Sequence, residues 1–260
     1  MEVRHLRRGS GEPYVLLHGI GSRAELWAPV MDVLAERFEV IAVDLPGFGS
    51  SPAQVERPTV DRQTDAFAGW LRAEGLEGCH VAGNSMGAGI ALELARRGAV
   101  ASAVALAPVG FWTPQERRWC QDSLRRATAQ MRALRSLLPA LVATAVGRSI
   151  FGWQLFGRPW AVPPRELLDS VEACLGAPAF AEALELFDDY TFHDGQELAN
   201  ARVTVAWGSR DRLLLARQAH RARRVLPSAR HEWLQGAGHL PMWDAPGAVA
   251  SVLAAGAAAA

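Results

Sequence analysis

Residues 79–97 read CHVAGNSMGAGIALELARR, and this stretch decides the fold. The apolar run Cys79–Ala82 favours a short strand, and the amphipathic run Met86–Arg97 favours a helix. Between them lies Gly83-Asn84-Ser85-Met86-Gly87, a G-x-S-x-G pattern. A serine that projects its oxygen from so sharp a turn needs glycine on both sides, because a side chain there would collide with neighbouring backbone. The stretch therefore predicts a strand-turn-helix unit that displays Ser85.

Short apolar runs alternate with longer amphipathic runs outside this stretch as well, which is typical of βα units around a mainly parallel sheet. We therefore expect an α/β fold. The expected strands are Val3–Arg7 at an edge, Tyr14–Leu17, Val40–Val43, Cys79–Ala82, Ala103–Ala107, Val203–Trp207 and His231–Leu234. The expected helices are Ala24–Glu36, Asp61–Glu74, Met86–Arg97, Ala216–Val225 and Pro246–Ala255.

The alternation breaks between residues 111 and 200, where the chain reads as several helices separated by prolines. We expect residues 1–110 and 201–260 to form the core domain and residues 111–200 to form a helical insertion. The insertion is rich in large aromatic side chains, notably Trp112, Trp153 and Phe156. They are expected to form the wall of an apolar pocket, although the same residues could equally be the insertion's own core.

A serine at such a turn needs a base and an acid before it can act as a nucleophile. Asp211 follows the expected strand Val203–Trp207, and His239 lies in a glycine-rich loop after the last strand. Because the carboxyl ends of parallel strands meet at one edge of a sheet, we expect both side chains to lie near Ser85. Each alone could be an ordinary loop residue. The order Ser, Asp, His after three strands favours a catalytic triad.

A second turn, His18-Gly19-Ile20-Gly21, follows the strand Tyr14–Leu17. It can aim the backbone N–H of Ile20 at the same point as the N–H of Met86, which would complete an oxyanion hole. We expect His18 to support this loop.

The same region also fits a different class of protein. Residues 19–24 match G-x-G-x-x-A, and Asp44 follows about 20 residues later, as in a dinucleotide-binding fingerprint. Such a site would make the chain an NAD-dependent oxidoreductase. This hypothesis leaves Ser85, Asp211 and His239 without a role, so we disfavour it.

Composition limits the possible partners. The 27 basic residues balance the 27 acidic ones, so net charge favours neither nucleic acid nor a membrane surface and suits a small, largely neutral substrate. Every basic residue is Arg, which excludes a lysine Schiff base and a P-loop lysine. The sequence has neither a secretory signal pattern nor an apolar run long enough to span a bilayer. We expect a cytoplasmic protein that requires no metal and no organic cofactor.

These motifs, together with the loop of residues 44–51 that reads DLPGFGSS, resemble the α/β-hydrolase superfamily over nearly the whole chain. The resemblance implies a structural role for Asp44 and a cap over the active site at residues 111–200. The GNSMG elbow is similar to that of carbon-carbon hydrolases that cleave ring-fission products. Those enzymes usually carry Trp after the catalytic His, where this chain has Leu240, and their first turn contains a proline that is absent here. We therefore expect hydrolysis of a small or medium acyl ester through an acyl-enzyme, with carbon-carbon, thioester or lactone cleavage as alternatives.

A non-enzymatic alternative is a ligand receptor, or a partner of an acidic carrier protein, on the same fold. A basic face on the cap could make that contact, although such a run is more often a solvated helix face. A complete triad favours turnover. The arginines concerned are Arg117, Arg118, Arg125, Arg126, Arg132 and Arg135.

Overall fold

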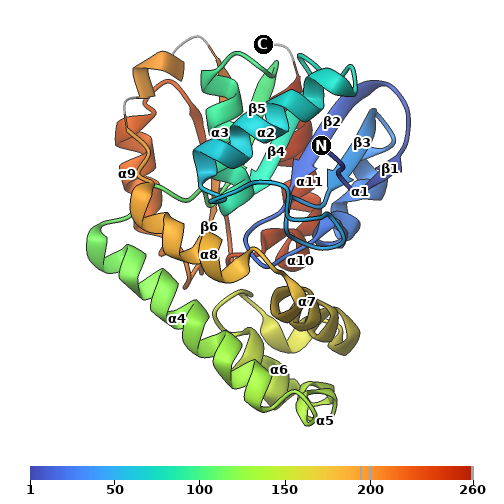
Figure 1. Ribbon diagram of the computed structural model, residues 1–260, viewed down its shortest axis with the longest axis vertical. Helices are drawn as coiled ribbons and strands as arrows, with labels where there is room; N and C mark the ends of the chain where they lie inside the picture. Colours follow the sequence, from blue (N-terminus) through green and yellow to red (C-terminus); the bar gives the residue numbers. More distant parts are fainter. Residues whose placement is uncertain (194, 199–200, 259–260) are drawn as a thin grey trace.

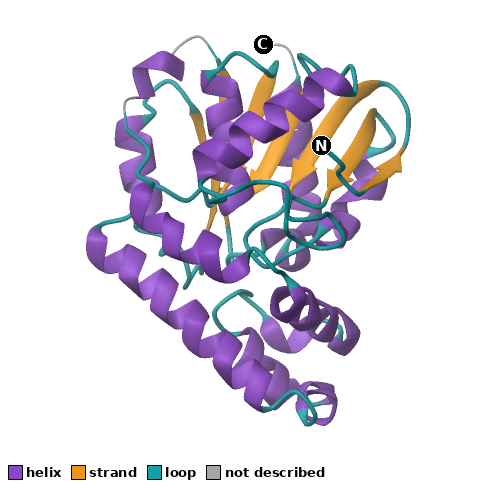
Figure 2. Ribbon diagram, in the orientation of Figure 1, coloured by secondary structure: helices purple, strands orange, loops and turns teal. Residues whose placement is uncertain are grey.

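The computed structural model describes residues 1–193, 195–198 and 201–258, and it is built around a seven-stranded sheet (Figures 1 and 2). The strands lie in the order β1-β3-β2-β4-β5-β6-β7. Strand β1 runs antiparallel to β3, and the other neighbouring strands are parallel. The strands are β1 (His5–Arg8), β2 (Glu12–Leu17), β3 (Phe38–Val43), β4 (His80–Asn84), β5 (Ser102–Leu106), β6 (Arg202–Gly208) and β7 (Arg230–Leu234).

Helices cover both faces of the sheet (Figure 1). Successive side chains of a strand point to opposite faces, so Val15 and Leu17 of β2 join one hydrophobic cluster, whereas Tyr14 and Leu16 join another. The first cluster contains the buried faces of α2, α3 and α9, and the second contains those of α1 and α11. These helices are α1 (Ala28–Leu34), α2 (Val60–Ala73), α3 (Met86–Arg96), α9 (Gln218–Val225) and α11 (Pro246–Ala257), with the short η1 (Ala24–Trp27) and α10 (Pro241–Asp244).

Helical elements fill the segment between β5 and β6, and those from α4 to α7 lie at the end of the sheet toward which the central strands point (Figure 2). The short η4 lies at the opposite end (Figure 1). None of the helices in the described ranges is both long enough and apolar enough to cross a membrane. The elements are α4 (Pro114–Ala133), α5 (Leu138–Ala143), α6 (Ala145–Gly152), η2 (Pro159–Ala161), α7 (Pro164–Gly176), α8 (Phe180–Glu185), η3 (Leu186–Asp189) and η4 (Gly195–Leu198).

The last part of this insertion packs into the main core of the protein. The Ala179 N–H donates to the Gly47 carbonyl, and the Tyr190 hydroxyl donates to the buried Glu93 carboxylate at 3.1 Å. Phe187 and Phe192 belong to the same hydrophobic cluster as α2 and α3. The insertion is thus continuous in sequence but anchored to the core by α8 and the residues after it. The exact domain boundaries at residues 110 and 200 stay a prediction.

The expected fold class and all seven strands are confirmed, with ends that shift by one or two residues. One helix differs from the prediction. The single helix expected at Ala24–Glu36 is divided into η1 and α1, which ends at Leu34. Pro29 explains the division, because it lacks the N–H that would bond to the carbonyl four residues earlier and is tolerated only in the first turn of a new helix.

Candidate active site

Ser85 lies between β4 and α3 in a strained backbone conformation, with φ 58° and ψ −114°. For a residue with a side chain, such a φ costs of order 1–3 kcal/mol and requires strong support from its surroundings. The two flanking glycines provide the space. A Cβ at Gly83 would lie 2.1 Å from the Gly87 carbonyl oxygen, and one at Gly87 would lie 2.4 Å from that of His18. Larger residues are excluded from both positions, and the turn therefore presents the serine as the sequence predicts.

Asp211 and His239 form a buried pair at the carboxyl ends of β6 and β7. The imidazole Nδ1 lies 2.8 Å from Asp211 Oδ2. The other carboxylate oxygen, Oδ1, accepts the N–H groups of Leu213 and Leu214, each at 2.9 Å. The carboxylate therefore has a fixed orientation, and its bond to Nδ1 requires the proton on that nitrogen. This leaves Nε2 as the acceptor of the ring.

The loop after β2 carries Ile20, and Met86 is the first residue of α3. An N–H in the first turn of a helix has no partner inside the helix. Within the described residues, no hydrogen bond from the Ile20 N–H is found. Gly19 is the residue that approaches the serine most closely, because a Cβ there would lie 3.0 Å from Ser85 Cβ. Both backbone groups thus lie in elements that adjoin the serine, and their role as an oxyanion hole stays a prediction.

His18 holds the peptide group between Gly19 and Ile20. Its Nε2 accepts the Leu45 N–H at 2.9 Å, so Nδ1 carries the proton and donates to the Gly19 carbonyl at 2.7 Å. In a trans peptide the N–H points away from the carbonyl, so fixing the Gly19 oxygen also fixes the direction of the Ile20 N–H. Complete burial lowers the pKa of His18, which keeps the ring neutral.

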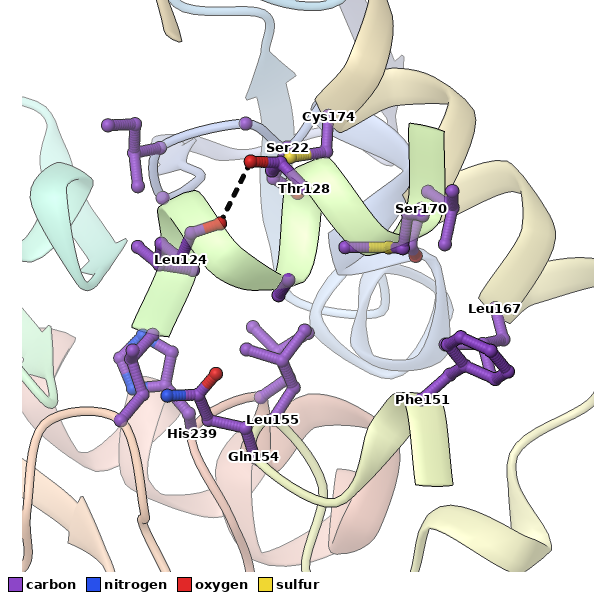
Figure 3. A pocket seen from close by; sticks show the side chains of 18 of the residues that line it. Ser22, Leu124, Thr128, Phe151, Gln154, Leu155, Leu167, Ser170, Cys174 and His239 are labelled. Carbon is purple, nitrogen blue, oxygen red and sulfur yellow. Dashed lines mark hydrogen bonds between the residues drawn. The ribbon is translucent and has the colours of Figure 1, made fainter. Parts of the chain in front are cut away.

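Ser85, His239 and Ile20 all line one cavity of about 140 Å³. Its wall includes side chains of the insertion from α4, α6 and α7, among them Leu124, Phe151 and Leu167 (Figure 3). Within the described residues, no hydrogen bond joins the Ser85 hydroxyl to His239. Such bonds often tighten only when a substrate is bound. The labelled wall residues in Figure 3 are Ser22, Leu124, Thr128, Phe151, Gln154, Leu155, Leu167, Ser170, Cys174 and His239.

The aromatic wall differs from the one expected from sequence. Trp153 lines the cavity, together with Phe151. Trp112 packs against Phe187 and donates its indole N–H to the Tyr190 carbonyl, while Phe156 is buried in the second core cluster. Trp112 and Phe156 are therefore not among the cavity-lining residues, because the hydrophobic core takes up their side chains. The expectation for these two residues is corrected accordingly.

Asn84 is a site residue that the motif analysis did not single out. Its side-chain amide donates to the carbonyl of His239 at 3.0 Å and to that of Leu106 at 3.3 Å. It is completely buried and lines the cavity. Asn84 therefore ties the serine turn to the histidine loop. Its place inside G-x-S-x-G was visible in the sequence, but the bond to a residue 155 positions later was not.

Asp244 is a second residue that sequence reasoning missed. Its Oδ2 accepts the N–H groups of Gly157 and Gly238 at 2.7 and 2.8 Å, and its Oδ1 accepts the N–H of Arg158 at 3.0 Å. The residue is buried, with 4% of its surface exposed. It therefore joins the insertion at residues 157–158 to the loop that carries His239. The only signal in the sequence was an acidic residue shortly after that histidine.

Asp44 has no free oxygen for a ribose. Its Oδ1 accepts the Ala24 N–H at 2.6 Å, and its Oδ2 accepts the Ser50 N–H at 2.8 Å and contacts Arg4 at 3.3 Å. The side chain is fully buried, and a Cβ at Gly49 would lie 2.3 Å from its Cγ. Asp44 thus organises the loops around β2 and β3, which is the structural role that the resemblance implies.

Several of the cap arginines pair with acidic neighbours. Arg117 Nε lies 3.0 Å from Asp188, and Arg125 lies 3.2 Å from Asp122. Arg135 pairs with Glu172 at 2.5 Å. These pairs reduce the positive charge available to an acidic partner, and the carrier contact stays a prediction.

The parallel sheet, the strained serine turn and the Asp–His pair at the same edge define a hydrolase of the α/β class. The chain belongs to the Alpha/beta hydrolase family, whose model matches residues 14–252.

The proteins and solved structures that the chain resembles are named for several different activities. The chain is 29% identical over 256 residues to the dihydrolipoyllysine-residue acetyltransferase component of the acetoin cleaving system of Cupriavidus necator, matching 94% of this chain but spanning only 63% of that relative. It is 40% identical over 95 residues to a pimeloyl-[acyl-carrier protein] methyl ester esterase of Aeromonas hydrophila, which covers 36% of each chain. A solved structure described as a membrane phospholipase A from a bacterium is 27% identical, with a TM-score of 0.75, and the match covers 98% of this chain and 81% of that one.

Proposed function

We propose that the protein is a serine hydrolase that cleaves an ester of a small or medium acyl group. One observation carries the proposal: a buried Asp211–His239 pair at 2.8 Å lines up at the same sheet edge as Ser85 on its strained turn. Ser85 and His239 share the wall of one cavity. This set supplies a nucleophile, a base and a group that orients the base.

In the first half of the reaction, His239 Nε2 takes the proton of the Ser85 hydroxyl while the serine oxygen attacks the ester carbonyl. Asp211 holds the proton on Nδ1 and stabilises the imidazolium that forms. The N–H groups of Ile20 and Met86 bind the oxyanion of the tetrahedral intermediate. His239 then gives its proton to the leaving alcohol, which leaves an acyl group on Ser85.

In the second half, His239 Nε2 removes a proton from a water molecule that attacks the acyl-enzyme. The tetrahedral intermediate collapses, the proton returns to Ser85 and the acid product leaves. These steps need only the chain's own residues. Thioester, lactone and carbon-carbon cleavage could use the same residues, and the similarity to a methyl ester esterase supports an ester first.

Replacement of Ser85 by Ala tests the proposal. Wild-type protein and Ser85→Ala are assayed with p-nitrophenyl esters of graded chain length and with a ring-fission dienoate. We expect the wild type to hydrolyse short and medium esters, and Ser85→Ala to lose all but the background rate. Ser251→Ala is a matched control, because Ser251 lies on the exposed side of α11 and bonds only its own helix. A rate within about tenfold of wild type for Ser85→Ala would remove Ser85 from the mechanism.

A further inference from the structure

The cavity around Ser85 and His239 is lined by side chains without a formal charge. Among the described residues that form its wall there is no Asp, Glu or Arg. Beside Ser85 and His239, the wall consists of apolar groups with a few neutral polar ones, namely Ser22, Asn84, Thr128, Gln130, Gln154 and Ser170. Burial raises the pKa of the Cys174 thiol, which also lines the wall, to about 12, so it too is neutral.

Two arginines close to this wall, Arg23 and Arg212, are engaged elsewhere. Arg23 follows the wall residue Ser22, and its guanidinium lies 3.3 Å from Asp169. Arg212 donates to the backbone carbonyls of Trp153 and Phe156. Arg132 on α4 lies close enough to the wall residue Cys174 for its charge to oppose the effect of burial on the pKa of that thiol, but its side chain is exposed to solvent, which screens the charge. None of these arginines contributes to the cavity surface, so an anion inside would have no cation to pair with.

Two of the neutral polar side chains in the wall, Thr128 and Gln154, are already hydrogen-bonded within the protein. The Thr128 hydroxyl lies 2.9 Å from the carbonyl of Leu124 (Figure 3) and 3.0 Å from that of Arg125. The Gln154 amide donates to the Ser123 hydroxyl at 2.6 Å. A carboxylate that enters the cavity would find neutral donors such as Ser22, Gln130 and Ser170 but no cation in the wall. It would therefore exchange its hydration for a largely apolar and uncharged surface, and burying an unpaired charge is among the most costly transfers in proteins.

The size of the cavity limits the size of the acyl group that it can hold. One water needs on the order of 10–15 Å³ measured in the same way. The volume of about 140 Å³ therefore corresponds to roughly ten water-sized positions.

We infer that the cavity selects esters with an uncharged acyl group of modest size and rejects substrates that carry a carboxylate, including ring-fission dienoates. This inference rests on the proposed function, because it names the substrate class of the same site. The wall side chains include no cation that could pair with a carboxylate on the acyl chain, and the lack of such a pair is sufficient for discrimination.

Three esters of equal chain length isolate the effect of charge: ethyl hexanoate, monoethyl adipate and ethyl adipamate. The adipamate carries an amide where the adipate carries a carboxylate, so the two differ in charge but hardly in size. We expect wild-type kcat/KM at neutral pH to be at least about 100-fold lower for monoethyl adipate than for ethyl adipamate. Values within threefold of each other would overturn the inference while leaving the proposed ester hydrolysis intact.

Binding to Ser85→Ala, measured by calorimetry, tests the cavity without turnover. We expect ethyl hexanoate and ethyl adipamate to bind, and monoethyl adipate to bind at least about 100-fold more weakly. If the wild type hydrolyses none of the esters, the proposed function fails. The binding preference still decides whether the cavity rejects anions, and equal affinities, or no binding by any of the three esters, would contradict the inference.

A charge added to the wall provides the converse test. Gln130 lines the cavity from the exposed side of α4, so Gln130→Arg can place a guanidinium at the wall without disturbing the buried core. Ala129→Arg is the matched control, since Ala129 is exposed on the same helix but is not a wall residue. We expect Gln130→Arg to raise the affinity for monoethyl adipate by about tenfold or more and Ala129→Arg to leave it unchanged. Equal effects of both substitutions would mean that general surface attraction, and not the wall, controls the binding of anions, and would refute the inference.

Discussion

Replacing Asp211 by Asn changes one oxygen for an NH₂ group, and the structure predicts which way the new amide turns. In the wild type, Oδ1 accepts two backbone N–H groups, from Leu213 and Leu214, while Oδ2 accepts the His239 Nδ1 proton. The amide of Asn has one oxygen only. If the amide oxygen faces the N–H groups of Leu213 and Leu214, both of these bonds are kept and only the bond from the His239 Nδ1 proton is lost. In the opposite orientation, the NH₂ group would face two N–H donors and both backbone bonds would be lost.

The favoured orientation therefore presents the NH₂ group to His239 Nδ1. That nitrogen must then accept, so the proton moves to Nε2, which faces the serine and can no longer serve as a base. A loss on the order of 10⁴ in kcat follows, the size observed for the same tautomer error in serine proteases. KM should change little, because the substitution leaves the cavity wall as it is.

The assay is steady-state hydrolysis of a short activated ester by wild type and Asp211→Asn, with melting temperatures measured in parallel. Asp65→Asn makes the same chemical change at an exposed ion pair with Arg97, where little effect on rate or stability is expected. If kcat of Asp211→Asn stayed within about tenfold of wild type, another group would have to orient His239, and the argument from the two backbone bonds would be refuted.

Three further predictions concern the groups around the triad. Asp244→Asn places an NH₂ group opposite a backbone N–H at the contact between the insertion and the histidine loop. The free energy of unfolding, measured by chemical denaturation, should therefore fall by about 1–3 kcal/mol, and kcat/KM should fall equally for all esters. A change in chain-length preference alone would contradict this. Trp153→Ala should shift the ratio of kcat/KM for long over short esters by about tenfold, with little change in melting temperature. Phe156→Ala should instead lower the free energy of unfolding by about 3–5 kcal/mol and reduce kcat/KM for all substrates together. The reverse pattern would overturn the placement of the two side chains. Because burial lowers the pKa of His18 below its ordinary 6.5, the unfolded state binds its proton more readily, and the stabilisation by neutral His18 is complete above pH 6.5 and is lost as the pH falls below it. Between pH 7.5 and 5, the melting temperature of the wild type should therefore fall more steeply with decreasing pH than that of His18→Asn. An equal fall in both proteins would show that His18 does not cause this pH dependence.

The sheet and the three proposed triad residues could be predicted from local patterns. Each strand is a short apolar run, and Ser85, Asp211 and His239 each follow one, so the parallel topology alone brings them to the same edge. The boundary between η1 and α1 could not be predicted from the amphipathic pattern alone, because it depends on Pro29, which lies in the first turn of α1 in the middle of that pattern.

The cavity wall could not be predicted in the same way. Trp112, Trp153 and Phe156 look alike in sequence, but their surroundings depend on how the cap folds back onto the core. Phe156 points into the second core cluster, because the next residue, Gly157, lies against the backbone of Gly236 and Gly238 with no room for a side chain between them. The same long-range packing gives Asp244 its partners 86 and 87 positions away, and no local pattern encodes that distance.

The central claim is that Ser85 is the nucleophile, and labelling with a fluorophosphonate followed by peptide mass spectrometry tests it most directly. A phosphonate transfers only to a serine whose hydroxyl is activated by a neighbouring base, so other serines of the chain act as internal controls. The account predicts a single adduct on Ser85, formed in step with the loss of ester hydrolysis. An adduct on a different residue, or full inactivation with Ser85 unmodified, would contradict it.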